Sequence, residues 1–257
     1  MEININCDLG EKSKFHSTEN DAALLSIINS ANVACGFHAG DDETMRMVVK
    51  TSKKNGVSIG AHPSFNDLEN FGRKRINLNS LEIRQLIIDQ YEILQNFAEE
   101  VNEKVTHIKP HGALNNMACE DLELATTLAN TIYGIDKDII YLVPTGSKME
   151  IAARKLDMKI ACEIFADRNY EDDGNLISRS KSNALIIDPD IANEHVLDMV
   201  KNQSLNCISG KKIPCEINSI CIHGDNKSSL NTAKLIKQNL TNNGLELKPL
   251  NKMTKFI

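Results

Sequence analysis

The stretch HIKPHGAL, residues 107–114, runs from a short apolar segment directly into two ionisable side chains. Pro110 and Gly112 end regular structure and turn the chain, since proline lacks an N–H donor and glycine permits unusual backbone angles. Lys109 and His111 therefore stand where a buried strand meets a loop. This placement predicts a functional site at the end of the strand.

The same succession, a short apolar run followed by polar residues and a segment of helical period, recurs along the chain. Strands are expected at 3–6, 32–37, 57–61, 105–109, 139–143, 159–165, 219–223 and 245–250. Helices are expected at 20–30, 41–55, 79–103, 119–133, 147–157, 190–202 and 227–243. Such alternation predicts a mainly parallel α/β sheet, either closed into a barrel or doubly wound. About seven strands without a G-x-G-x-x-G motif favour the barrel, as one domain over 1–257.

Composition restricts the functional class. Hydrophobic residues make up 41% and charged residues 25% of the 257 residues, as in an ordinary globular protein. The net charge of -6, with both signs mixed along the chain, argues against nucleic-acid binding. Without a leader or a long apolar run, we expect a cytoplasmic protein with no membrane contact, and a homo-oligomer stays open. Seven cysteines without a C-x-x-C pair predict reduced, buried thiols.

Most of the expected strands end in ionisable or hydroxyl side chains. These ends meet at one face of a parallel barrel, so residues distant in sequence should converge there. Gathering so many charges is costly, and acid–base chemistry explains it better than packing does. His16 and His195 are instead expected at the surface. The strand-end residues are Asp8, Glu11, His38, Asp41, His62, Lys109, His111, Thr145, Ser147, Glu163, Asp167, Arg168, His223 and Asp225.

Some of these residues have simpler explanations. Asp41 and Ser147 precede helical segments and suit helix caps. The basic run 73–75 suits either an anion contact or a solvated loop. The set Asp8, His62 and His111 suits an open divalent-metal site, but the same three residues suit metal-free acid–base catalysis.

Eight motifs in order along nearly the whole chain resemble the LamB/YcsF family. They are NCDLGE, ANVACGFHAGD, GAHPSF, FGRKR, IKPHGAL, EIFADRNY, DGNLISRS and CIHGD. The resemblance implies a distorted seven-stranded β/α barrel similar to glycoside hydrolases and deacetylases. It also implies ATP-dependent cleavage of 5-oxoproline (pyroglutamate) to L-glutamate, together with two partner 5-oxoprolinase subunits.

Most of the strand-end residues match positions in the family motifs and are expected to have functional roles on that ground. Thr145 and Glu163 are included only because of their positions at strand ends. The expected catalytic residues are Asp8, His38, His62, Lys109, His111, Asp167, Arg168 and His223. The expected substrate-binding residues are Glu11, Asp41, Thr145, Glu163 and Asp225. The chain departs from the family pattern at 12–15, at Phe65 and at Asn115, the last two being tyrosine in many members.

The chain contains no G-x-x-x-x-G-K-[ST] loop, so we expect ATP to be a co-substrate bound at or with the partner subunits. His111 or His62 would then act as a base toward water, Lys109 and Arg168 would stabilise negative charge, and Asp8 or Asp225 would orient an imidazole. Two alternatives remain: a metal-dependent deacetylase or amidohydrolase acting without ATP, and a non-catalytic subunit that binds a small molecule. The polar insertion 167–183 would serve as a lid or as a partner-docking surface.

Overall fold

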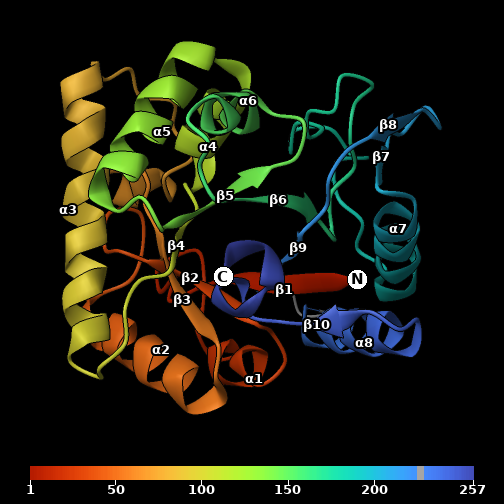
Figure 1. Ribbon diagram of the computed structural model, residues 1–257, viewed down its shortest axis with the longest axis horizontal. Coiled ribbons are helices and arrows are strands. Elements are labelled where there is room, and N and C mark those ends of the chain that lie inside the picture. The colour runs from red at the N-terminus through yellow and green to blue at the C-terminus, as the bar shows by residue number, and fades with distance from the viewer. Residues whose placement is uncertain (225–228) are drawn as a thin grey trace.

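The computed structural model describes residues 1–224 and 229–257, which form a closed barrel of parallel strands with helices around it (Figure 1). The barrel strands are β1 (Glu2–Leu9), β2 (Ser30–Ala34), β3 (Ser58–His62), β4 (His107–Ile108), β5 (Ile140–Pro144), β6 (Ile160–Phe165) and β9 (Ser219–His223). Each strand pairs with the next, and β9 closes the ring because it pairs with both β6 and β1. The seven-stranded barrel expected from the sequence is confirmed. The last expected strand, β10 (Glu246–Leu247), pairs with the first residues of β1 outside the ring.

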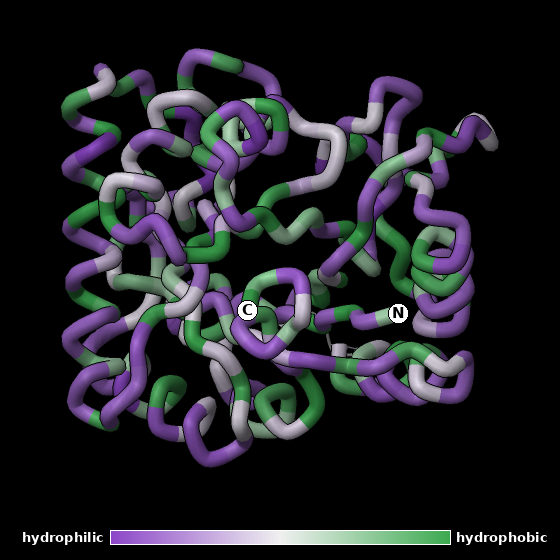
Figure 2. The backbone as a smooth tube through the Cα atoms, in the orientation of Figure 1, coloured by the Kyte–Doolittle hydropathy of each residue, from purple (hydrophilic) through white to green (hydrophobic). Residues whose placement is uncertain are grey.

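The helices lie on the outside of the strands (Figure 1). They are α1 (Asp21–Leu25), α2 (Asp42–Asn55), α3 (Ser80–Glu99), α4 (Gly112–Glu120), α5 (Leu122–Ile135), α6 (Lys148–Lys155), α7 (Pro189–Asn202) and α8 (Ser229–Asn242), with 3-10 turns η1 (Leu68–Asn70), η2 (Leu250–Lys252) and η3 (Thr254–Phe256). Figure 2 shows green and purple alternating along these helices, as expected for elements that pack one face on the strands. No helix within 1–224 and 229–257 is both long and apolar enough to cross a bilayer. All seven cysteines are free thiols.

Two predicted helices differ from the structure, and two elements were not predicted. The helix expected at 119–133 begins at Leu122, where Asp121 caps it as α5, and α4, which starts directly after His111, was not predicted. The helix expected at 20–30 ends at Leu25, which lets β2 begin at Ser30. The hairpin of β7 (Ser204–Asn206) and β8 (Lys212–Pro214) was not predicted, since its strands are too short to give a periodic signal.

The interior of the barrel is polar. Along β1, the buried residues Ile3 and Ile5 alternate with the buried amides Asn4 and Asn6, as the period of two in a strand requires. The amides bond across the barrel: Asn4 Nδ2 donates to the Lys248 carbonyl (2.8 Å), and Ser219 Oγ donates to Asn4 Oδ1 (2.7 Å).

The amide network continues toward the ends of the strands. Asn6 Nδ2 donates to Ser219 Oγ (2.8 Å), and Asn32 Nδ2 donates to both Asn6 Oδ1 (2.8 Å) and Asp8 Oδ1 (2.7 Å). A continuous column of hydrogen bonds therefore runs through the barrel to Asp8. Buried amides are costly unless they are bonded in this way.

The C-terminal segment closes the opposite end of the barrel. Leu250, Met253 and Phe256 pack as one buried cluster with Ile140 and Ala161, which lie at the starts of β5 and β6. This segment does not cover the other end of the barrel, where the carboxyl ends of the strands lie.

Candidate active site

A cavity of about 470 Å³ lies at the carboxyl ends of the strands, a volume that suits a small molecule. The residues of the expected site that line it are Asp8, Glu11, His62, Lys109, His111, Thr145, Ser147, Arg168 and His223. The predicted convergence of strand ends thus brings nine expected residues to one cavity. The insertion forms part of the wall through Gly174, Leu176 and Arg179.

The remaining expected residues lie elsewhere. His38, Glu163 and Asp167 contact lining residues without lining the cavity themselves. Asp41 is exposed, caps α2 through the Thr44 amide, and pairs with Lys12 on the surface. Asp225 lies outside the described residues.

Lys109 is a buried cation that links two carboxylates. Its Nζ lies 3.0 Å from Asp8 Oδ1, 3.3 Å from Glu163 Oε2 and 3.0 Å from Cys221 Sγ. Burial alone would lower the pKa of Lys109, but the charge of Asp8 outweighs it and holds that pKa well above its usual range. Burial would likewise raise the pKa of Asp8, but the charges of His62 and Lys109 hold it well below its usual range. The wall of the cavity therefore carries an ionised Asp8–Lys109 pair.

Burial has the opposite outcome at Glu163. Here desolvation is not overcome by Lys109, so the pKa of the carboxyl is raised. Glu163 Oε1 is buried and has no hydrogen-bond partner in the described part of the chain. Glu163 therefore contacts Lys109 as the less readily ionised of its two carboxyl partners.

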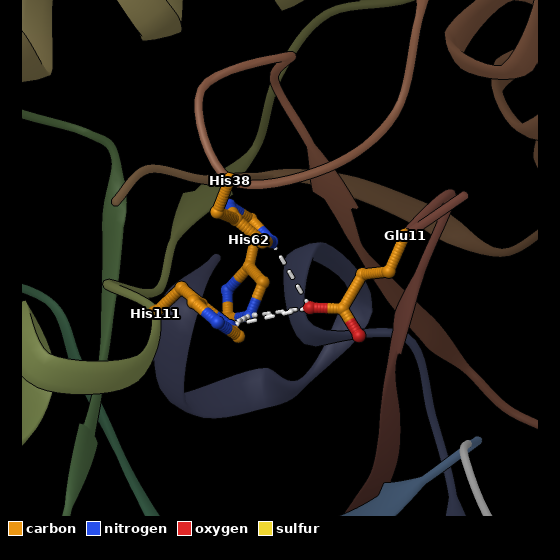
Figure 3. A group of neighbouring side chains, drawn as sticks. All are labelled: Glu11, His38, His62 and His111. Atoms are coloured by element: carbon orange, nitrogen blue, oxygen red, sulfur yellow. Dashed lines mark hydrogen bonds and ion pairs between the residues drawn. The ribbon is translucent and has the colours of Figure 1, made fainter. Parts of the chain in front are cut away.

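Three imidazoles converge on one carboxylate oxygen (Figure 3). Glu11 Oε1 lies 3.0 Å from His38 Nε2, 3.2 Å from His111 Nδ1 and 3.8 Å from His62 Nε2. The His38 and His111 rings are stacked with centroids 3.8 Å apart and planes at 7°. Burial lowers the pKa of both His38 and His111 well below the usual range, so these two rings are neutral at pH 7.

Backbone carbonyls fix the tautomers of His62 and His111. His62 Nδ1 donates to the Lys109 carbonyl (2.7 Å), and His111 Nε2 donates to the Phe71 carbonyl (3.0 Å), since a carbonyl oxygen can only accept. The two remaining nitrogens, His62 Nε2 and His111 Nδ1, face each other at 3.0 Å. His62 Nε2 also lies 3.3 Å from Asp8 Oδ2, so a proton on this nitrogen or a metal cation beside it would relieve the contact between the two rings.

Two glycines allow the loop that carries Phe71 to reach His111. Gly72 and Gly112 both have positive φ, 63° and 56°, and a Cβ on Gly112 would lie 2.6 Å from the Gly72 carbonyl oxygen. That carbonyl accepts from the Ala113 amide at 2.9 Å. The glycine of the KPHG stretch is therefore required by close backbone contact as well as by the turn.

His223 forms an ion pair on another side of the cavity. Its Nδ1 lies 2.8 Å from Asp167 Oδ1, and its ring stacks on Phe165. Burial would lower the pKa of His223, but Asp167 outweighs it and raises that pKa. The same pairing lowers the pKa of Asp167 against the effect of burial. Asp167 therefore favours the protonated imidazole, a proton donor beside the cavity.

Other expected residues have structural partners. Arg168 donates to the Ile177 carbonyl (2.6 Å) and so ties down the insertion, while Thr145 Oγ1 donates to the Glu216 carbonyl. Ser147 caps α6, as its position before a helix predicts. His16 and His195 are both half-buried, so the expected surface position holds only in part, and His195 Nε2 has no partner among the described residues.

Sequence reasoning missed the residues beneath the site. His107 Nε2 lies 3.1 Å from Asn32 Oδ1, and its ring occupies the space that a Cβ on Gly60 would fill, 2.1 Å from that nitrogen. Burial lowers the pKa of His107 to about 3. A signal was available in the alternating Asn-Ile-Asn of β1, because buried amides in a central strand require partners inside the barrel.

The described residues include two groups with metal-ligand chemistry. One group comprises Glu11, His38, His62 and His111, and the other comprises Asp8, Cys221 and His223. The expected set of Asp8, His62 and His111 is thus divided between them, with Glu11 beside the two histidines. Carboxylate and imidazole donors suit zinc and other divalent transition ions.

The chain is similar to known proteins along nearly its whole length. Residues 3–255 match the model of the LamB/YcsF family. A Clostridium beijerinckii protein, named as a 5-oxoprolinase subunit, is 42% identical over 251 residues, covering 98% of each chain. A Staphylococcus carnosus protein of the same name is 39% identical over 250 residues, covering 97% of this chain and 99% of the relative.

Solved structures agree with these similarities. The crystal structure of a lactam utilization protein from Thermus thermophilus has a TM-score of 0.89 at 31% identity, covering 96% of this chain and 99% of that one. The peptidoglycan deacetylase PdaC from Bacillus subtilis shares only the fold, with a TM-score of 0.50 at 13% identity over 99% of this chain and 90% of its own. From its motifs, its barrel and these relatives, the chain belongs to the LamB/YcsF family.

Proposed function

We propose that this chain is one component of a 5-oxoprolinase, which opens the lactam of 5-oxoproline to give L-glutamate while ATP is hydrolysed. Similarity over nearly the full length to proteins named as 5-oxoprolinase subunits supports the substrate and the need for further subunits, of which we propose two. The observation that carries the proposal is one small cavity lined by a buried lysine, a pair of facing imidazoles and a carboxylate-paired histidine. These are groups that hydrolysis of an amide requires.

ATP makes the reaction feasible because an unactivated lactam is a poor electrophile. Transfer of the γ-phosphoryl group to the lactam oxygen releases ADP and activates the ring carbon. Water adds to that carbon, the carbon–nitrogen bond breaks, and the nitrogen takes up a proton as it leaves. The resulting acyl phosphate reacts with a second water to give glutamate and inorganic phosphate.

The residues that line the cavity suit separate steps of this sequence. The cluster of His62, His111 and Glu11 is the place to activate water, because the neutral His111 ring lies at the cavity wall beside His62 and Glu11. Lys109 stabilises negative charge on the reacting carbon's oxygen, which is the usual role of a fixed cation in acyl transfer. His223, held in the protonated form by Asp167, donates the proton to the leaving nitrogen.

The nucleotide and the substrate carboxylate both need cationic partners. Arg73 and Arg179 line the cavity, and guanidinium groups bind carboxylates and phosphates in two-point contacts. With no phosphate-binding loop in the sequence, the ATP site is assigned to the assembly with the two partner subunits.

A second candidate is a metal-dependent amidohydrolase that works without ATP. The group of Glu11, His38, His62 and His111 favours it, since such a group can hold an ion. The two candidates differ in their need for ATP and for partner subunits.

Reconstitution tests the proposal. The chain is mixed with its two partner subunits, 5-oxoproline and ATP, and glutamate and ADP are measured together. We expect about one ADP per glutamate in the full mixture, and no glutamate when ATP is omitted. His223→Gln should lower turnover by about 10²-fold or more through loss of the proton donor, while His16→Gln should not. An absence of glutamate in the full mixture would refute the proposed reaction, and ATP-independent glutamate would favour the amidohydrolase.

A further inference from the structure

We propose that Glu11, His62 and His111 form an open site for one divalent transition ion of the zinc class. The starting observation is the pair of facing nitrogens, His62 Nε2 and His111 Nδ1, 3.0 Å apart. Both rings donate their other N–H to backbone carbonyls, so both facing nitrogens present lone pairs when the rings are neutral. A cation between them relieves the opposed lone pairs, and the Asp8 carboxylate, whose Oδ2 lies 3.3 Å from His62 Nε2, places a second negative charge beside that position.

The spacing of the three donor atoms fits a metal ion. Ligands about 2.0–2.2 Å from zinc in a tetrahedral site lie roughly 3.3 Å from one another. The three separations here are 3.0 Å between the two imidazole nitrogens, 3.2 Å from Glu11 Oε1 to His111 and 3.8 Å from Glu11 Oε1 to His62. The rings of His62 and His111 are nearly perpendicular, at 81°, so one point can lie in both ring planes.

His38 is excluded from the ligand set by its orientation. Its ring is parallel to that of His111, with centroids 3.8 Å apart, so an ion in the plane of one ring lies well outside the plane of the other. Its Nε2 lies 3.0 Å from Glu11 Oε1, and its Nδ1 lies 2.8 Å from Ser64 Oγ. His38 is therefore a positioning residue that holds the Glu11 carboxylate.

The surroundings are those of a site built for an ion. Carbonyl groups behind each ligating imidazole fix the ring and its tautomer, an arrangement usual for metal-bound histidines. Glu11, His62 and His111 all line the cavity, whereas His38 does not, so the open side of the site faces the cavity. A bound ion with an open position can hold and acidify a water molecule, which would supply the nucleophile for any hydrolysis in this cavity.

Metal uptake by the purified full-length chain tests the inference. The chain is stripped with a chelator and dialysed against Zn²⁺ or Co²⁺ alone. Bound metal is counted by mass spectrometry, and the Co²⁺ form is examined by visible absorption. We expect one ion per chain and a Co²⁺ spectrum with bands of a low-symmetry site of nitrogen and oxygen donors.

Variants then identify the ligands. Glu11→Gln and His111→Ala should each weaken binding by more than about 100-fold, whereas His38→Ala should keep one ion with an affinity about 10–100-fold lower. His16→Gln is the matched control and should bind like the wild type. Circular dichroism checks that each variant is folded. If a variant of a proposed ligand does not fold, the Co²⁺ spectrum of the wild-type chain still tests whether nitrogen donors hold the ion.

Two outcomes would overturn the inference. The first is a wild-type chain that takes up neither ion, which would leave a shared proton between His62 and His111. The second is a loss of metal binding in His38→Ala as complete as in His111→Ala, which would show that His38 is a ligand and that the three-ligand set is wrong. Uptake is measured without substrate, ATP or partners, so failure here leaves the proposed lactam reaction standing, and failure of that reaction leaves the metal site standing.

Discussion

Replacing Lys109 with methionine should destabilise the fold and abolish turnover for two separable reasons. Methionine keeps much of the apolar stem but removes the cation from Asp8 Oδ1, Glu163 Oε2 and Cys221 Sγ. Removing one partner of a buried ion pair costs about 3–5 kcal/mol, because the remaining charge stays desolvated. We expect a loss in this range in the free energy of unfolding, measured by urea titration at pH 7. The exposed substitution Lys50→Met on α2 should change it by less than about 0.5 kcal/mol.

A second substitution separates stability from function. Adding Glu163→Gln to Lys109→Met removes one of the two carboxyl groups left without a cation, so about half of the lost stability should return. Turnover in the reconstituted complex should stay about 10²–10³-fold below the wild type in both variants, since the fixed positive charge is still missing. If Lys109→Met costs less than about 1 kcal/mol, or if the double variant regains turnover, the roles assigned to this lysine are wrong.

Three further predictions concern positions around the site. Gly60→Ala places a Cβ 2.1 Å from His107 Nε2 and should cost about 2–3 kcal/mol of unfolding free energy. Combining it with His107→Ala should cost less than the sum of the two single changes, and simple additivity would contradict the packing described. The pKa of His223 is raised above 6.5 and that of Asp167 is lowered below 3.8. Their pairing should therefore stabilise the fold fully between these values, and the stability difference from His223→Gln should shrink as pH rises through the folded-state pKa of His223 or falls through that of Asp167. Arg168→Met removes a bond that closes the insertion on itself, so limited proteolysis should cut within 167–183 faster than in the wild type, and an unchanged cleavage rate would count against this role.

Much of the fold could be predicted because its signals are local. Alternating apolar runs and helical segments predicted a parallel barrel, and Asp41 marked the start of α2 correctly. The errors came where local signals are weak or compete. The helix at 112–120 was missed because Pro110 and Gly112 indicate a turn directly before residues that favour a helix.

The sequence predicted that residues from several strand ends come together, but it did not predict the geometry of their contacts. Ionisable residues at strand ends pointed to Lys109 and His111, because parallel strands bring those ends together. Sequence cannot show which nitrogen of an imidazole faces the cavity, since that depends on carbonyl groups such as that of Phe71, far along the chain. It also could not separate Asp41, a surface helix cap, from Glu11, which lies at the centre of the imidazole cluster.

The column of amides through the barrel has a practical consequence for engineering. A library that varies only residues in contact with a ligand would leave out Asn6, Asn32 and Ser219, although these hold Asp8 through successive hydrogen bonds. Small changes at these hidden positions can reorient Asp8 and its partner Lys109 without altering the shape of the cavity. Selections for altered turnover should therefore recover substitutions in the interior of the barrel, at residues that do not line the cavity themselves.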